Sequence, residues 1–94
     1  MSAHVAIIIH KMKDEAAFAE YRKSAGAAIA KHGGALVAPP SKPLQLDGSG
    51  DIPAFVTLLS FPSKEAAEAW RNDPELDELH AQRNAGIEAT IYAF

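Results

Sequence analysis

The hydrophobic and polar positions of the chain follow two different periods, and the changes between them mark its elements. Val5–Ile9 is an unbroken apolar run rich in β-branched residues, which predicts a strand. From Asp14 to Gly34 the apolar residues recur every three or four positions, which is the period of an amphipathic helix. A second apolar run spans Ala54–Phe61. In Ile87–Phe94, small and β-branched apolar residues at every second position alternate with the other side chains of the segment. Both segments predict strands.

The helix predicted after the first strand has recognisable ends. Asp14 is a typical N-cap residue, and Gly33 and Gly34 stand where a helix ends in the left-handed conformation that glycine adopts most easily. The apolar positions of this segment share one face of the helix. They are Phe18, Tyr21, Ala25, Ala28 and Ile29. We therefore expect the helix to pack this face on a sheet.

The stretch Phe61–Arg83 contains two helix starts. Ser63 and Asp73 are both N-cap residues, and Pro74 follows Asp73 at the first helical position, where its missing N–H has no cost. A helix that restarts at Asp73 carries four residues on one face at i, i+3, i+4 and i+7: Leu76, Leu79, His80 and Arg83. We expect a short helix, a break, and a second helix that brings the last two of them toward the sheet or the rim of the helix–sheet cleft.

A proline-rich segment joins the first helix to the strand at Ala54–Phe61. It contains four of the six prolines, and proline cannot donate to a sheet ladder, so we expect a broken edge strand over Leu36–Leu46 and then a Gly-rich turn. The element order is then β-α-β-β-α-β. This is the ferredoxin-like α+β arrangement, a four-stranded antiparallel sheet with helices on one face. We expect residues 1–94 to form one such domain.

Apolar residues occupy both faces of the predicted sheet. Every position of Val5–Ile9 is apolar. In the strand Ala54–Phe61, Val56 and Leu59 are apolar on opposite faces, whereas a sheet with one face in water alternates apolar and polar residues. Two helices cover only one face, so we expect the other to pack on a second copy in a homodimer, with the segment Ala38–Leu46 reaching across. The alternative is a monomer with an open apolar face.

Composition narrows the classes of partner. The net charge is −3 and the nine Lys and Arg residues form no basic run, so we expect no nucleic-acid binding. The apolar run Val5–Ile9 is too short for a signal peptide or a membrane span, and we expect no membrane partner. Cysteine is absent, which is typical of a reducing compartment. These features together predict a cytoplasmic protein.

Candidate chemistry is sparse. The four histidines do not have the HxH or HExxH spacing of metal ligands, and we expect neither a metal nor a cofactor. Gly33-Gly34 and the glycines of Gly48–Asp51 are turn residues, because neither group lies between a strand and the start of a nucleotide-binding helix. There is no serine elbow or catalytic triad order. Sequence motifs therefore point to no established reaction.

The best candidate site combines four residues of the predicted cleft between helices and sheet. His80 supplies a titratable imidazole and Arg83 a guanidinium for an anionic or enol oxygen, with Tyr21 and Trp70 as apolar walls. These residues predict a site for a small organic ligand. The structural alternative is a pair on the helix edge, either Asp77 with His80 or a carboxylate with Arg83.

The whole chain resembles a family of small proteins of unknown function within the dimeric α/β-barrel superfamily, related to the antibiotic biosynthesis monooxygenases. The matching features are Asp14 with Phe18 and Tyr21, "KHGG" at residues 31–34, "LDG" at 46–48, "FPS" at 61–63, and "AWRNDPEL" at 69–76 leading to Arg83. The resemblance implies a dimeric α/β barrel. Members of the superfamily include cofactor-free oxygenases, isomerases and haem enzymes, so the fold does not determine the chemistry.

Three positions depart from the pattern that the resemblance implies. Ala35 and the stretch Ala38–Pro40 stand where the family tends to have arginines and a glycine pair, and Ile9 stands where a polar residue is common. These departures favour a non-catalytic or accessory homodimeric module. The alternative is a cofactor-free monooxygenase- or isomerase-like enzyme, or a binder, that acts on small aromatic or polyketide-like molecules. The sequence does not decide whether the protein is an enzyme.

Overall fold

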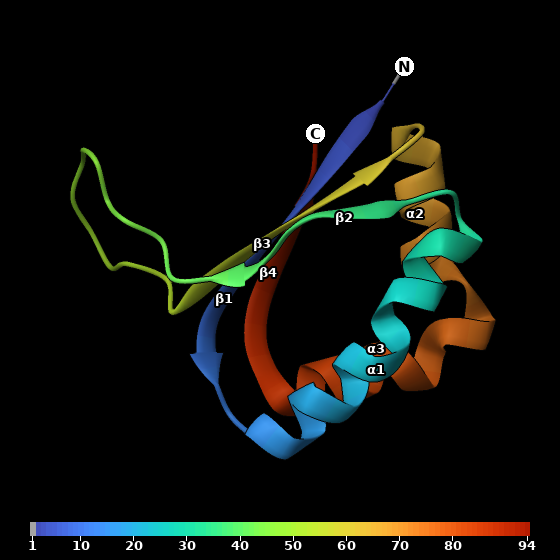
Figure 1. The fold of residues 1–94 in the computed structure, drawn as a ribbon, viewed down its shortest axis with the longest axis horizontal. Helices are drawn as coiled ribbons and strands as arrows, with labels where there is room; N and C mark the ends of the chain where they lie inside the picture. Colours follow the sequence, from blue (N-terminus) through green and yellow to red (C-terminus); the bar gives the residue numbers. More distant parts are fainter. Residues whose placement is uncertain (1) are drawn as a thin grey trace.

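The computed structural model describes residues 2–94, so that Met1, the first residue of the predicted domain, lies outside the described residues. The elements follow the order β-α-β-β-α-β, with the second helical region divided. They are β1 (Ala3–Met12), α1 (Glu15–Lys31), β2 (Ala35–Ser41), β3 (Phe55–Phe61), α2 (Lys64–Asn72), the 3-10 turn η1 (Pro74–Leu76), α3 (Asp77–Gly86) and β4 (Ile87–Ala93). Figure 1 shows this arrangement, which confirms the predicted ferredoxin-like α+β fold.

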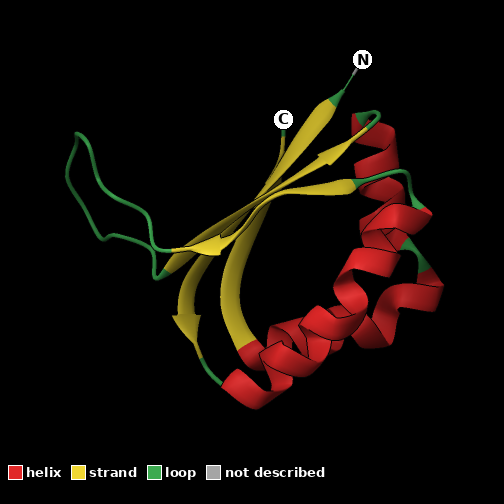
Figure 2. Ribbon diagram, viewed as in Figure 1, coloured by secondary structure: helices red, strands yellow, loops and turns green. Residues whose placement is uncertain are grey.

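The four strands form one antiparallel sheet in the order β2-β3-β1-β4. Figure 2 shows all the helices on one side of this sheet. The core lies between the two layers. Alternate residues of β1, such as Val5, Ile7 and Ile9, point into it, as do Leu59 and Phe61 of β3. This period of two follows from the pleat of a strand.

The predicted ends of α1 are confirmed. The Asp14 carboxylate accepts hydrogen bonds from the backbone N–H groups of Ala16 and Ala17, both at 3.1 Å. Gly33 follows the helix with a φ of 78°, the left-handed conformation expected where the helix ends. The face that packs on the sheet includes the buried residues Phe18 and Ile29. Local rules therefore determine where this helix begins and ends.

The predicted helix restart is confirmed as well. The hydroxyl of Ser63 caps α2 by accepting from Ala66 N–H, and the carboxylate of Asp73 accepts from Glu75 N–H at 2.9 Å. Pro74 occupies the first position of η1, which leads directly into α3. The restart turns the chain so that α3 packs along α1 and carries His80 and Arg83 inward.

The predicted length of the second strand is wrong. β2 ends at Ser41 rather than Leu46, because its pairing with β3 is already irregular after Leu36, and Pro43 has no N–H to extend the ladder. Residues 42–54 instead form an irregular loop that projects from the sheet, here called the arm (Figure 1). Three large apolar side chains of the arm are exposed: Leu44, Leu46 and Ile52.

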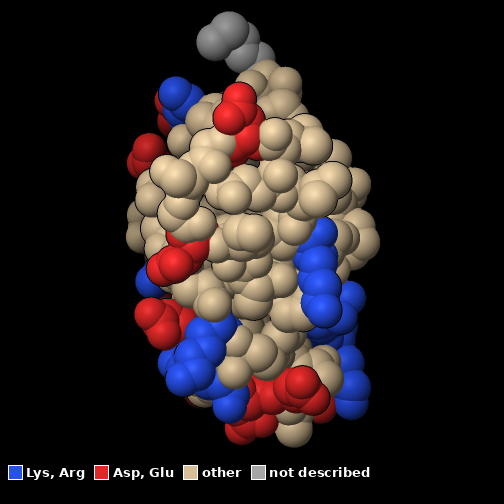
Figure 3. Space-filling model, turned by 90° about the vertical axis from the view of Figure 1, so that its left-hand side faces the viewer, with Lys and Arg blue, Asp and Glu red and all other residues tan. Residues whose placement is uncertain are grey.

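The sheet face opposite the helices, here called the open face, carries an apolar row across all four strands. The register aligns Ala38 of β2 with Leu58 of β3, Leu58 with Ala6 of β1, and Ala6 with Tyr92 of β4. Within residues 2–94, no helix covers this row. Figure 3 views the side from which the arm projects, and shows a broad area without charged side chains, bordered by Lys, Arg, Asp and Glu.

Candidate functional site

A cavity of about 200 Å³ lies between α1 and the helix-covered face of the sheet. Aliphatic side chains make most of its wall, among them Ile9 of β1, Ile29 of α1 and Leu59 of β3. An apolar cavity of about 150 Å³ is large enough to hold benzene, so this space accepts one ring with a small substituent. Four polar side chains also line it: Tyr21, Arg22, Thr57 and Arg83. No carboxylate belongs to the described lining.

Arg83 is a buried cation on the wall of this cavity. The residue is only 2% exposed, and its guanidinium carbon lies 5.9 Å from the ring centroids of both Tyr21 and Trp70. One terminal nitrogen donates to Nδ1 of His80 at 2.8 Å, while Nε has no partner in the described residues. No ion pair to Arg83 occurs among residues 2–94. A buried charge without a counterion is unfavourable, so this guanidinium is available to an anion.

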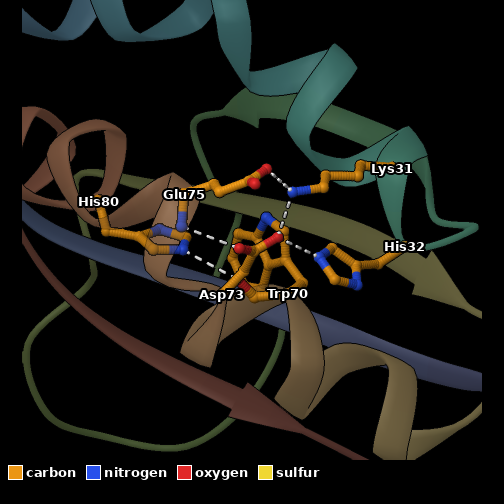
Figure 4. Close-up of polar contacts among 6 residues, drawn as sticks. All are labelled: Lys31, His32, Trp70, Asp73, Glu75 and His80. Carbon is orange, nitrogen blue, oxygen red and sulfur yellow. Dashed lines mark hydrogen bonds and ion pairs between the residues drawn. The ribbon is translucent and has the colours of Figure 1, made fainter.

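His80 lies behind Arg83 rather than in the cavity. Its Nδ1 accepts from Arg83, since a guanidinium can only donate, and its Nε2–H therefore donates to the Trp70 carbonyl at 3.0 Å. Figure 4 shows the contact with Trp70. Burial lowers the pKa of His80 from its ordinary value of 6.5; the bond to the Trp70 carbonyl opposes this shift and the charge of Arg83 adds to it. Both ring nitrogens of the neutral imidazole are thus occupied.

Thr57 is a cavity residue that the sequence interpretation missed. It lies in the middle of β3, is 6% exposed, and its hydroxyl oxygen is buried without a hydrogen-bond partner among residues 2–94. An unpaired buried hydroxyl is unfavourable unless a bound molecule or water satisfies it. The signal was a single polar residue on the inward-facing side of an otherwise apolar strand.

The four predicted site residues separate into two groups. Tyr21 and Arg83 line the cavity, whereas His80 and Trp70 do not belong to its wall. Trp70 is a core residue, 2% exposed, whose ring lies 5.1 Å from that of His80 in an edge-to-face arrangement. The structural alternative, a surface pair involving Asp77 or another carboxylate, is wrong because His80 and Arg83 are both buried and bond to each other.

The three positions that depart from the family pattern lie in different parts of the structure. Ile9 lines the cavity, so a polar side chain at this position would face its interior. Ala35 is exposed, and Ala38 belongs to the row on the open face. Neither alanine is part of the cavity wall, whereas Pro40 of the same stretch lines it, so only the departures at Ile9 and Pro40 change the cavity.

A second polar cluster joins the end of α1 to the helix restart (Figure 4). The amine of Lys31 contacts the carboxylates of Asp73 at 2.7 Å and Glu75 at 2.6 Å, and Nε2 of His32 lies 2.9 Å from Asp73. Hydrogen bonds from Lys31 and then His32 hold the pKa of the Asp73 carboxyl well below its usual range. The cluster lies outside the cavity wall and fastens two segments that are distant in sequence.

Among residues 2–94, no group of three histidine, cysteine or acidic side chains is close enough to hold a metal ion. Within the same range, no helix is long and apolar enough to cross a membrane.

The sequence of residues 4–94 matches the family described as Domain of unknown function (DUF1330). The chain belongs to this family. The match covers nearly the whole chain and agrees with the resemblance inferred from its motifs. No curated protein matches the chain.

Solved structures with low sequence identity share the fold. A protein of unknown function from Rhodopseudomonas palustris is 19% identical with a TM-score of 0.77, and the alignment covers 99% of this chain and 80% of that one. SnoaB from Streptomyces nogalater, described as a cofactor-independent oxygenase, is 14% identical with a TM-score of 0.60, covering 99% and 88%. An EthD-like protein from Ralstonia eutropha is 21% identical with a TM-score of 0.56, covering 99% and 89%. At these identities the similarity shows the fold alone.

Proposed function

We propose that the protein is a non-catalytic module that binds a small, flat organic acid in the cavity. The observation that carries this proposal is the state of Arg83, a buried guanidinium on the cavity wall without a carboxylate partner among residues 2–94. A carboxylate accepts strong, charge-assisted hydrogen bonds from a guanidinium. Such a ligand would neutralise the buried charge and give the free Nε a partner.

The rest of the wall fits the apolar part of such a ligand. Tyr21 offers an aromatic face, and Ile9 and Leu59 offer aliphatic surface. The hydroxyl of Thr57, which has no partner in the described residues, would supply a further hydrogen bond to the same ligand. A few convergent polar groups in a mainly apolar cavity are typical of sites for small organic molecules.

The cavity wall supports binding rather than acid–base catalysis. General acid–base catalysis requires a titratable group within hydrogen-bond reach of the reacting atom. His80, the nearest imidazole to Arg83, uses one nitrogen to accept from Arg83 and the other to donate to Trp70. No carboxylate among the described lining residues replaces it, which leaves the phenol of Tyr21, a weak acid, as the one neutral proton donor of this kind on the described wall.

A second candidate is cofactor-free turnover of a phenol or enol in the same cavity. The observation that favours it is again Arg83, because a fixed donor in an apolar site also stabilises an oxyanion as it forms. Incubation of the protein with an electron-rich phenol in air, followed by mass analysis, separates the candidates. Consumption of the phenol in proportion to protein would favour the enzyme, and an unchanged phenol would favour the binding module.

Ligand-induced thermal stabilisation tests the binding proposal. Benzoate and ring-substituted benzoates would be compared with the matched amides, which keep the shape and lack the charge. At 100 times its dissociation constant a ligand stabilises the folded state by about 2.7 kcal/mol, which raises the melting temperature of a small domain by several degrees. We expect this shift with acids and not with amides. Equal shifts with both sets, or none with any acid, would overturn the proposal.

We also propose that the protein forms a homodimer through the open face, each protomer being the single domain of residues 1–94. A two-fold interface requires a surface that complements itself, and the uncharged row from Ala38 to Tyr92 meets this requirement. The exposed arm residues Leu44 and Leu46 would pack on the partner. A stable dimer should bury at least about 1,200 Å² in total.

The lack of cysteine supports a reducing, cytoplasmic location.

A further inference from the structure

The mouth of the cavity lies between α1 and the edge strand β2. Three lining residues are exposed, and they identify this opening: Arg22, Gly26 and Leu36. Pro40 of β2, which is partly buried, lines the same cavity. A ligand that reaches Arg83 from solvent would therefore pass between Gly26 and the side chains of β2.

Gly26 has no packing reason to be glycine. It lies inside α1, where glycine is about 1 kcal/mol less favourable than alanine. A Cβ placed on Gly26 would meet no atom within 4 Å, so close approach of another element does not require its small size. Its φ is not positive either. What its lack of a side chain does provide is open space at the mouth.

Arg22 places a second cation at this mouth. It precedes Gly26 by four residues, and residues four apart are neighbours on a helix surface. Among residues 2–94 it forms no ion pair, although Lys23 beside it pairs with Glu20 at 3.0 Å. The cavity thus has a guanidinium at its mouth and another, Arg83, on its buried wall, with no carboxylate in the described lining.

We infer that the ligand is a diacid, which enters past Gly26 and places one acid group at Arg83 and the other at Arg22. This inference rests on the proposed function, because it names the chemical class that the same cavity takes. The ring or short chain between the two acid groups lies against the aliphatic wall. The cation at the mouth selects the second acid group, and the glycine leaves the path to the inner cation open.

Two ligands that differ in one group test the second acid position: terephthalate and its monoamide. The two equivalent acid groups of the diacid give it a statistical advantage of about twofold, and at low salt we expect the wild type to bind it a further two- to fivefold or so more tightly, about the range for an exposed ion pair. Arg22→Gln should reduce the preference to the statistical factor and leave the monoamide affinity unchanged. A wild-type preference no greater than the statistical factor, or an unchanged preference in Arg22→Gln, would overturn the inference alone. If neither ligand bound, the proposed function would fail as well.

Two substitutions at one position test the path. Gly26→Ala should raise the melting temperature of the ligand-free protein, because alanine is the better helix former and meets no neighbour. Gly26→Leu should fold as well but bind both ligands more than tenfold more weakly, because its side chain would occupy the mouth. If Gly26→Leu folds and binds like the wild type, the ligand does not enter past this residue and the inference is wrong.

Discussion

Two hydrogen bonds in series join Arg83, His80 and Trp70. Arg83 donates to His80, and His80 donates to the backbone carbonyl of Trp70. Helical spacing in the sequence correctly places His80 and Arg83 on the inward face of one helix. It does not predict that they bond to each other, because a spacing rule gives a face and not the atoms opposite it.

Thr57 and Gly26 illustrate a further limit at the scale of residues. Thr57 is an inward-facing hydroxyl in an apolar strand, and only the register of β3 shows that it meets the cavity. Gly26 occupies a helix interior where the sequence shows only a weak helix former. The space around each residue depends on segments distant in the chain, which local patterns do not describe.

Trp70→Ala should reduce the free energy of unfolding by about 3–5 kcal/mol, the range for deleting a large aromatic side chain from a core. The indole is 2% exposed and packs against Phe61 and His80. Urea denaturation measures the loss, and Trp70→Phe is the control, with a smaller loss expected. A loss below about 1 kcal/mol for Trp70→Ala would show that the side chain does not support the core.

His80 should make stability depend on pH in a defined direction. Because burial lowers its pKa in the folded protein below 6.5, the unfolded chain binds more protons in the window between the two values. The free energy of unfolding should therefore fall as the pH decreases from 7.5 through this window. His80→Gln should have a flatter profile by urea denaturation at pH 7.5, 6.5 and 5.5. Parallel profiles for the two proteins would contradict this assignment, since His4, His10 and His32 are common to both.

At the scale of elements, local rules predict where most helices and strands begin. The caps at Asp14, Ser63 and Asp73 give three starts correctly, because each depends only on a side chain and the next turn of backbone. β2 is the exception. Its end depends on how it pairs with β3, and that irregular register is not visible in the proline pattern alone.

Two substitutions at Asp73 distinguish the stability that its N-cap hydrogen bond contributes from the stability that its negative charge contributes. Asp73→Asn keeps an oxygen that accepts from Glu75 N–H but removes the charge that faces Lys31 and His32. Asp73→Ala removes both. We expect the melting temperature at pH 7 to fall in both variants and further in the alanine variant. An alanine variant that melts with the wild type would show that neither the cap nor the cluster supports the helix restart.

The charge of Asp73 also gives the second pH window. Its pKa is lowered in the folded protein, so the stability it contributes is present above its ordinary value of 3.8 and is lost as the pH falls toward the folded-state value. This window begins at 3.8, below the ordinary value of 6.5 at which the His80 window begins. The wild type should therefore be more stable than Asp73→Asn at pH 7, and the two pH profiles should converge only in strongly acidic solution. Convergence already between pH 7 and pH 6 would assign the effect to another group.

At the scale of the whole molecule, the sequence predicts the ferredoxin-like sheet because its apolar runs and its segments with helical period occur in the order β-α-β-β-α-β. The same runs indicate two apolar faces, and the structure shows helices on only one of them. The cavity could not be predicted in this way, because its volume depends on how α1 and the sheet are spaced. Which molecule covers the open face stays a prediction.

The homodimer prediction is tested by sedimentation at micromolar concentration. One chain has a mass of 10.0 kDa, and the wild type should sediment with about twice this mass. Leu58→Lys places a charge in the middle of the apolar row and should give a folded monomer, whereas Ala27→Lys on the exposed side of α1 should remain dimeric. A folded wild-type monomer would contradict the proposed interface.

The most direct test of the account is a calorimetric titration of benzoate into the wild type and Arg83→Leu at pH 7.5, with the ligand-free melt of each protein recorded. We expect the wild type to bind and Arg83→Leu to lose at least tenfold in affinity, because the leucine cannot donate to the carboxylate. The variant should still fold, with a lower melting temperature, because it leaves Nδ1 of the buried His80 without a donor while it removes a buried charge that has no counterion among the described residues. Equal affinity in the two proteins, or an Arg83→Leu variant that does not fold, would contradict a ligand-binding role for this buried cation.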